Sequence, residues 1–120
     1  MDITPLVTPD FKLIQSYAAG MFRVSGEVYE CPVLICGDNA EEWRVLSFLD
    51  VNDQIKALSG FIDVLLIGAG STFSVLPPSQ RAVFAGLGFT VEVMDTPAAC
   101  RTYNVLTAEG RQVAAALILV

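Results

Sequence analysis

The sequence predicts an α/β fold of three layers around a mixed central sheet, and three observations lead to this prediction. Residues 61–70 form an apolar run that is interrupted only at Asp63, rich in branched side chains and ended by glycines, which is typical of a strand buried on both faces. Residues 61–120 alternate strand and helix patterns in the order βαβαβ, which favours parallel strands joined by right-handed crossovers. A hydrophobic content of 53% in 120 residues is enough for one core, so we expect a single domain over 1–120.

The first half of the chain predicts a small antiparallel layer. Residues 1–20 contain two prolines and a short apolar patch, so we expect an extended arm with at most one helical turn. Residues 21–46 favour antiparallel strands, with a tight reversal at Ser25-Gly26. The strands expected there are 22–24, 28–29, 33–36 after Pro32, and 42–45, with Trp43 packed over the open face of the layer.

The remaining elements are predicted from helix caps and breakers. We expect a short helix at 52–58, capped by Asp50 or Asn52, before a strand at 61–67 that forms the middle of the sheet. The elements expected after it are a helix from the cap Ser79 to Leu87 ended by Gly88, a strand at 89–94, a helix with Thr96 as cap and Pro97 at its first position ended by Gly110, and a strand at 113–120.

The composition excludes several function classes. A net charge of −6 repels phosphate backbones and anionic lipid surfaces, so nucleic acid is not expected as a partner. The N-terminus lacks a secretory pattern and the apolar tail is far shorter than the roughly 20 residues that span a bilayer, so we expect no direct membrane insertion. Three cysteines without a C-x-x-C pair, and no histidine, predict a reducing, cytoplasmic setting and no metal site.

The loop after the predicted central strand is the first candidate site, because ligands of open α/β sheets bind beyond the carboxyl ends of strands. The candidate residues are Gly68, Gly70 and Ser71. Two glycines after a strand fit part of a dinucleotide fingerprint, but Phe73 stands at the third glycine position and no G-K-[ST] follows. A tight exit from a buried strand is therefore the favoured interpretation, and no cofactor is predicted.

The helix that starts at Pro97 is the second candidate. Its periodicity predicts a core-facing stripe at residues 98, 99, 102, 103, 105 and 106, which leaves Cys100, Arg101 and Asn104 on the solvent side. A cysteine near a helix N-terminus beside an arginine is a candidate nucleophile, although the chain has no histidine to act as its base. Asp95 is expected to bond the first amides of this helix or the loop at Gly68.

Four stretches carry a resemblance to a known family. They are 17–22, 29–34, 63–70 with Pro77-Pro78, and 91–106 followed by Glu109-Gly110-Arg111. Together they resemble, in the right order, mitochondrial complex I assembly factor 3 and its small bacterial and archaeal relatives. The sequence departs from the family at Cys31, where glycine is usual, and at Cys36-Gly37, where proline is common. The resemblance implies a three-layer α/β fold and supplies no catalytic residues.

Two functional hypotheses follow. The first is a non-catalytic protein-interaction module that helps to assemble or mature a membrane-associated respiratory complex and is held at the inner membrane through a protein partner. It would bind this partner through the face carrying Arg101 and Asn104 and through the loop at 68–73. A homo-oligomer is compatible with it. The alternative is a small-molecule-binding domain or enzyme that uses a cleft between the Gly68 loop and the helix at Pro97. The candidate binding residues are Gly68, Gly70, Ser71, Asp95, Thr96, Cys100, Arg101 and Asn104.

Overall fold

The computed structural model describes residues 12–44, 51–71 and 75–120, which form two sheets and three helices. The smaller sheet is antiparallel, with strands β1 (Ile14–Ala18), β2 (Met21–Val24) and β3 (Glu27–Tyr29) in that order. The larger sheet has the order β5-β4-β8-β6-β7, and its strands are β4 (Val33–Cys36), β5 (Asn39–Glu42), β6 (Val64–Gly68), β7 (Thr90–Met94) and β8 (Val113–Leu117). The helices are α1 (Asp53–Lys56), α2 (Pro78–Ala85) and α3 (Thr96–Ala108).

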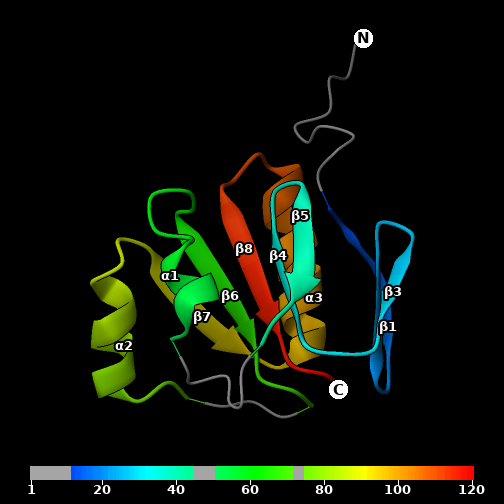
Figure 1. Ribbon diagram of the computed structural model, residues 1–120, viewed down its shortest axis with the longest axis horizontal. Helices are drawn as coiled ribbons and strands as arrows, with labels where there is room; N and C mark the ends of the chain where they lie inside the picture. Colours follow the sequence, from blue (N-terminus) through cyan, green and yellow to red (C-terminus); the bar gives the residue numbers. More distant parts are fainter. Residues whose placement is uncertain (1–11, 45–50, 72–74) are drawn as a thin grey trace, which may run out of the picture.

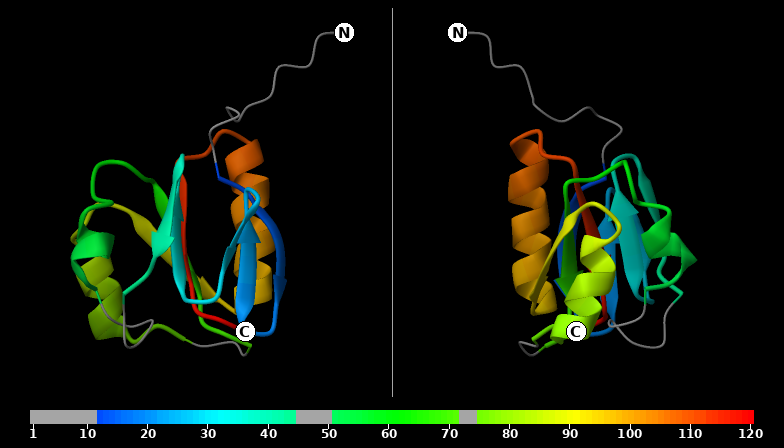
Figure 2. Two further views of the ribbon diagram at one scale, coloured as in Figure 1. Left: turned by 45° about the vertical axis from the view of Figure 1, so that its right-hand side comes forward. Right: turned by 90° about the vertical axis from the view of Figure 1, so that its left-hand side faces the viewer.

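These elements stack in three layers around the larger sheet (Figures 1 and 2). Helices α1 and α2 cover one face, and α3 with the smaller sheet covers the other. Within the larger sheet, β8, β6 and β7 are parallel, while β4 runs antiparallel to both β8 and β5. The predicted fold class, an α/β arrangement with a mixed sheet and an antiparallel layer from the first half, is confirmed.

Strand β6 shows why the fold needs a layer on each side of the sheet. Its side chains alternate between the two faces, as the pleat of a strand requires. Val64 and Leu66 pack in the cluster beneath α3, whereas Leu65 and Ile67 pack in the cluster beneath α1 and α2. Every residue of the strand is buried, so an unbroken apolar run is the sequence that this position demands.

The prediction that the strand near residue 61 forms the middle of the sheet was wrong. The middle strand is β8, whose sequence Val-Ala-Ala-Ala-Leu is also fully buried. Strand β6 lies one place from the edge, and Phe61, expected at its start, is 71% exposed in the turn before it. The apolar run could not separate the two positions, because β6 has neighbours on both sides as well.

The first half also differs from its prediction. The expected arm includes a strand, β1, which pairs with β2, while residues 1–11 lie outside the described part of the chain. The Ser25-Gly26 reversal is confirmed, since both residues have positive φ angles in the β2–β3 turn. Strands β4 and β5 belong to the larger sheet, not to the small antiparallel layer, because β4 pairs along its full length with β8.

Several boundaries and caps were also predicted wrongly. Strand β5 occupies residues 39–42 instead of 42–45, and residue 45 is not described. Trp43 follows this strand and is buried beside α1, in the core of the larger sheet. Helix α2 follows Pro77 without any side-chain cap, so Ser79 lies within the helix, which ends before Gly86. The Asn52 cap of α1 is confirmed by a 3.1 Å hydrogen bond from the Ile55 amide to the Asn52 side-chain oxygen.

Candidate functional site

The loop at Gly68 is packed directly against the start of α3. A Cβ atom at Gly68 would lie 2.9 Å from the side chain of Leu117 and 3.0 Å from the Cα of Thr96, so only glycine fits without a shift. The Ala69 amide donates to the Met94 carbonyl at 2.8 Å, and the Thr96 amide donates to the Gly70 carbonyl at 2.7 Å. These bonds leave the glycines with a structural role as the exit of a buried strand.

The Thr96 hydroxyl connects three chain segments at this end of the sheet. It donates to the Ile118 carbonyl at 2.7 Å and accepts from the Gly70 amide at 2.9 Å, and the whole residue is buried. Thr96 is therefore not the helix cap that the sequence predicted. The cap is Asp95, whose carboxylate accepts from the Ala98 amide at 2.8 Å, as one of the two interpretations of Asp95 had it.

The Gly68 loop and the start of α3 are in direct contact within the part of the chain that the structure describes. Direct hydrogen bonds join the loop to the helix start, and both Gly68 and Thr96 are buried. Ser71 is exposed just beyond the loop, and residues 72–74 lie outside the described part of the chain. The cleft that the alternative hypothesis requires stays a prediction.

The predicted sides of α3 were wrong at two residues, whereas Ala99 and Tyr103 are buried and Arg101 is exposed as predicted. Cys100 is 3% exposed and lies in the core, whereas Val105, predicted to face the core, is exposed. The reason is that α3 is covered on two sides, by the larger sheet and by β1, so its buried stripe is rotated from the predicted one. Burial raises the pKa of the Cys100 thiol to about 12, which opposes a thiolate nucleophile at neutral pH.

Asn104 and its neighbour Tyr103 hold the N-terminal strand against α3. The Asn104 side-chain amide donates to the Ile14 carbonyl at 2.7 Å, and its oxygen accepts from the Ile14 amide at 3.0 Å. The Tyr103 hydroxyl donates to the Lys12 carbonyl at 2.7 Å. Asn104 is consequently engaged within the chain, while Arg101 is exposed to solvent.

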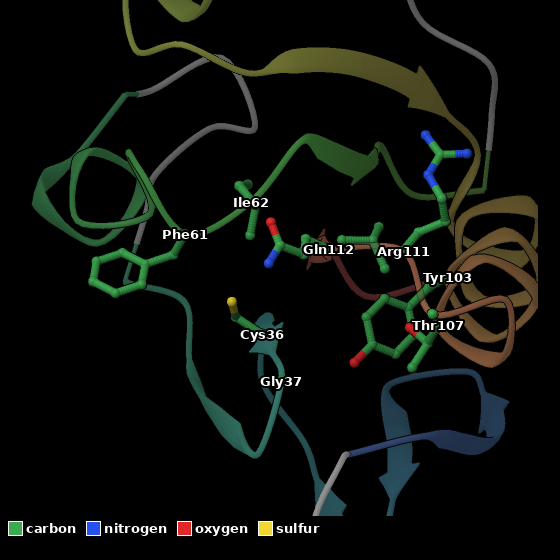
Figure 3. Close-up of a pocket in the computed structure, with 10 residues that line it drawn as sticks. Cys36, Gly37, Phe61, Ile62, Tyr103, Thr107, Arg111 and Gln112 are labelled. Atoms are coloured by element: carbon green, nitrogen blue, oxygen red, sulfur yellow. The ribbon is translucent and has the colours of Figure 1, made fainter. Parts of the chain in front are cut away.

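A cavity of about 290 Å³ lies at the opposite end of the sheet from the Gly68 loop (Figure 3). Helix α3 contributes Tyr103 and Thr107, the end of β4 contributes Cys36, and the turn after it contributes Gly37. In Figure 3 the Tyr103 and Thr107 side chains come from one side, and Cys36, Phe61, Ile62 and Gln112 border the other. The remaining wall is formed by Gly110, Arg111 and Val113.

Apart from Arg111, the side chains that line the cavity carry no charge at neutral pH. Burial raises the pKa of the Tyr103 phenol to about 12, and burial together with the nearby Asp38 raises the pKa of the Cys36 thiol. Arg111 is the charged member of the lining, and Figure 3 shows its guanidinium directed away from Cys36 and Tyr103.

Thr107 borders this cavity, but its hydroxyl is buried beside the Tyr103 phenol and is not open to the cavity. The residue is 2% exposed, and its hydroxyl makes no hydrogen bond within the described part of the chain. A buried hydroxyl that is left unpaired loses its hydration without compensation. This position was missing from the sequence-based candidates, although Thr107 lies four residues after Tyr103 and seven after Cys100, on the same helix face.

A second, wider hollow of about 620 Å³ adjoins the first, and Phe61 and Cys36 border both. Its floor includes Leu34 and Leu58, and its charged residues are Glu41, Arg44 and Asp53. The exposed ring of Phe61 therefore lies between two depressions, in a surface that we call the Phe61 surface and define by the linings of both hollows.

Two further structural findings concern the described residues alone. Over residues 12–44, 51–71 and 75–120, no helix has the length and apolar character needed to cross a membrane. In the same part of the chain, no three cysteine, aspartate or glutamate side chains are grouped closely enough to hold a metal ion.

Comparison with known proteins confirms the resemblance expected from the sequence. An uncharacterised protein of Rhodobacter capsulatus is 38% identical over 105 residues, which cover 88% of this chain and 82% of that protein. The NADH dehydrogenase [ubiquinone] 1 alpha subcomplex assembly factor 3 of Xenopus tropicalis is 33% identical over 91% of this chain. The match spans 62% of that assembly factor, so this chain corresponds to about three fifths of its length.

The fold has a solved counterpart as well. The NMR structure of a Mth938-like domain from Bordetella pertussis superposes with a TM-score of 0.77 at 25% identity, covering 99% of this chain and 92% of that one. The model of a family described as a protein of unknown function, DUF498/DUF598, matches residues 14–118. This chain therefore belongs to the DUF498/DUF598 family.

Proposed function

We propose that this protein is a non-catalytic protein-interaction module that helps to assemble or mature a membrane-associated respiratory complex of the NADH dehydrogenase type. The observation that carries the proposal is the 33% identity to an assembly factor of that complex, which extends over 91% of the chain. In this proposal the protein acts in the cytoplasm and reaches the inner membrane through its partner.

The Phe61 surface is the best place for that partner to bind. Aromatic side chains beside well-formed depressions are frequent centres of binding energy at protein interfaces. Phe61 is 71% exposed and borders both hollows, and the wider one has an apolar floor at Leu34 and Leu58. A partner segment with one large apolar side chain would fill this hollow and cover the Phe61 ring.

Charged groups around the wider hollow would orient the partner. Arg44 and Asp53 are exposed at its border and have opposite signs. Such rim charges contribute mainly to association rate and orientation, so partner binding should weaken moderately with salt. The earlier candidate surface at Arg101 is weaker, because its companion Asn104 is occupied by hydrogen bonds to β1.

The experiment is a gene deletion in the native host, followed by native gel electrophoresis of the NADH dehydrogenase complex in membranes. We expect the assembled complex to be depleted and to return with the wild-type gene. An unchanged amount of assembled complex in the deletion strain would refute the proposed function.

Three variants then locate the partner surface. We expect Phe61→Ala to fail in complementation, whereas Val75→Ala should succeed because Val75, 72% exposed, lies outside the Phe61 surface. Arg101→Ala tests the surface first expected on α3. Full complementation by Phe61→Ala together with failure of Arg101→Ala would move the partner to α3 and leave the function intact.

A further inference from the structure

We propose that the partner segment that binds at the wider hollow of the Phe61 surface is a basic amphipathic helix, which lies between α1 and β5. This inference rests on the proposed function, because it names the kind of partner that the Phe61 surface fits.

The wider hollow separates α1 from the strands β4 and β5. One wall comes from α1 and the turn after it, and the other comes from the cross-strand pairs Leu34–Glu41 and Cys36–Asn39. Figure 1 shows α1 in front of the sheet, with α2 on one side of it and β4 and β5 on the other. A helix laid in this hollow would therefore extend the helical layer that α1 and α2 form on this face of the sheet.

The edge of β5 is unsuited to the addition of a strand. β5 is an edge strand, and its backbone groups at Ala40 and Glu42 point away from β4, because the residues that alternate with them bond to β4. Both outward carbonyls already accept hydrogen bonds, Ala40 from the Tyr29 hydroxyl at 3.4 Å and Glu42 from the Gln54 side-chain amide at 2.8 Å. An added strand would have to displace both donors, so this surface favours a helix over a strand.

The apolar groups of the hollow fit one face of a helix. Phe61 is 71% exposed, Ala57 is exposed as well, and Leu34 and Leu58 lie below them. The hollow measures about 620 Å³, and a cavity of roughly 150 Å³ holds a benzene ring, so two large side chains have room here. Side chains three or four residues apart on a helix point the same way. One would enter the hollow, and its neighbour one turn away would cover the Phe61 ring.

The charges of the rim favour a basic partner. The lining contains two carboxylates, Glu41 and Asp53, and one cation, Arg44. Asp38 and Glu42 are exposed in and beside β5 and make that side of the hollow more negative. The chain as a whole has a net charge of −6, which attracts a basic segment and repels a second copy of the chain. We therefore expect lysine or arginine on the side of the partner helix that faces β5.

The test uses three synthetic peptides about 18 residues long, roughly 27 Å as a helix, titrated into the ¹⁵N-labelled full chain. The first has leucine and lysine at helical spacing. The second has the same composition in strict alternation, which is a strand pattern, and the third has the helical order with glutamate in place of lysine. We expect the first peptide alone to cause saturable amide shifts at Asn39, Ala57 and Phe61, and to become helical by circular dichroism when it binds.

Charge reversals at the two edges of the larger sheet locate the site. Glu41→Lys, in β5, should weaken binding of the first peptide about fivefold at low salt, and the loss should shrink as salt is added. Glu92→Lys is the matched control, because it makes the same change of charge in β7, outside the linings of both hollows. It should bind the peptide as the wild type does. Phe61→Ala should weaken binding about tenfold or more, as expected for a central aromatic anchor.

Three results would overturn the proposal. They are the absence of saturable shifts with the first peptide, equal or tighter binding of either other peptide, and equal losses from Glu41→Lys and Glu92→Lys. Each of them leaves the proposed function standing, since the gene deletion tests that function without any assumption about the structure of the partner. A normal amount of assembled complex in the deletion strain would instead refute the proposed function, whatever the peptides do.

Discussion

Replacing two buried threonines of α3 by valine should change the free energy of unfolding in opposite directions. Thr96 and Thr107 lie on the same helix and are both buried, and the substitution has the same shape at each. They differ in hydrogen bonding: the Thr96 hydroxyl makes two bonds, and the Thr107 hydroxyl makes none within the described residues. The pair therefore isolates the energetic effect of satisfying a buried hydroxyl.

The expected magnitudes follow from these contacts. An unpaired buried hydroxyl costs roughly 1–3 kcal/mol, so Thr107→Val should raise the free energy of unfolding by about 1 kcal/mol. For a chain of this length, that corresponds to a rise in Tm of about 4 °C. Thr96→Val should lower the free energy of unfolding by roughly 2–4 kcal/mol, because it also leaves the Gly70 amide and the Ile118 carbonyl without their partner.

Urea unfolding followed by circular dichroism measures both changes, with equal m-values as the control for unchanged compactness. Thr102→Val, at a half-buried position between the two, provides the baseline for exchanging one β-branched side chain for another in this helix. A Thr107→Val protein less stable than the wild type by more than about 1 kcal/mol would refute the reasoning, since the hydroxyl would then have a partner in solution.

Two further predictions concern α3. Asn104→Ala should lower the free energy of unfolding by about 2 kcal/mol, because two hydrogen bonds to β1 are lost, and hydrogen exchange should accelerate first in β1. The control Arg101→Ala, at an exposed position, should have a free energy of unfolding within about 0.5 kcal/mol of the wild type. Because the folded protein retains the Cys100 proton up to about pH 12 while the unfolded chain loses it near 9.0, stability should fall as pH rises above 9. Urea unfolding of Cys100→Ala should show a shallower fall, and an identical slope would contradict the raised thiol pKa.

Local signals were sufficient for much of the fold. The Ser25-Gly26 turn requires positive φ angles, and the Asn52 cap depends on a side chain three residues before the amide that it accepts from. Both are decided by neighbours in the sequence. The same holds for the end of α3, which comes before Gly110 as predicted, while its start at Thr96 is one residue earlier than predicted.

What the sequence could not reveal depends on contacts between distant residues. Strand β1 has a weak apolar pattern because four of its five residues are exposed, and its position is fixed by Asn104, ninety residues away. Cys100 is buried because α3 contacts β1 as well as the larger sheet. The prediction assumed that only one side of the helix is buried, and it therefore placed Cys100 on the solvent side. No periodicity in one segment contains that information.

The position of the cavity follows from the direction of β4. In an all-parallel sheet, the loops that can form a ligand site gather at the carboxyl ends of the strands. Here β4 is antiparallel to β8, so its own carboxyl end, at Cys36, pairs with Ala114 near the start of β8. The β4–β5 turn therefore faces the loop between α3 and β8 across the cavity, while the opposite end of the sheet is closed by Thr96. A mixed sheet can thus place its accessible hollow at the amino-terminal end of its parallel strands. The Gly68 loop, at their carboxyl-terminal end, connects strand β6 to the start of α3 through hydrogen bonds.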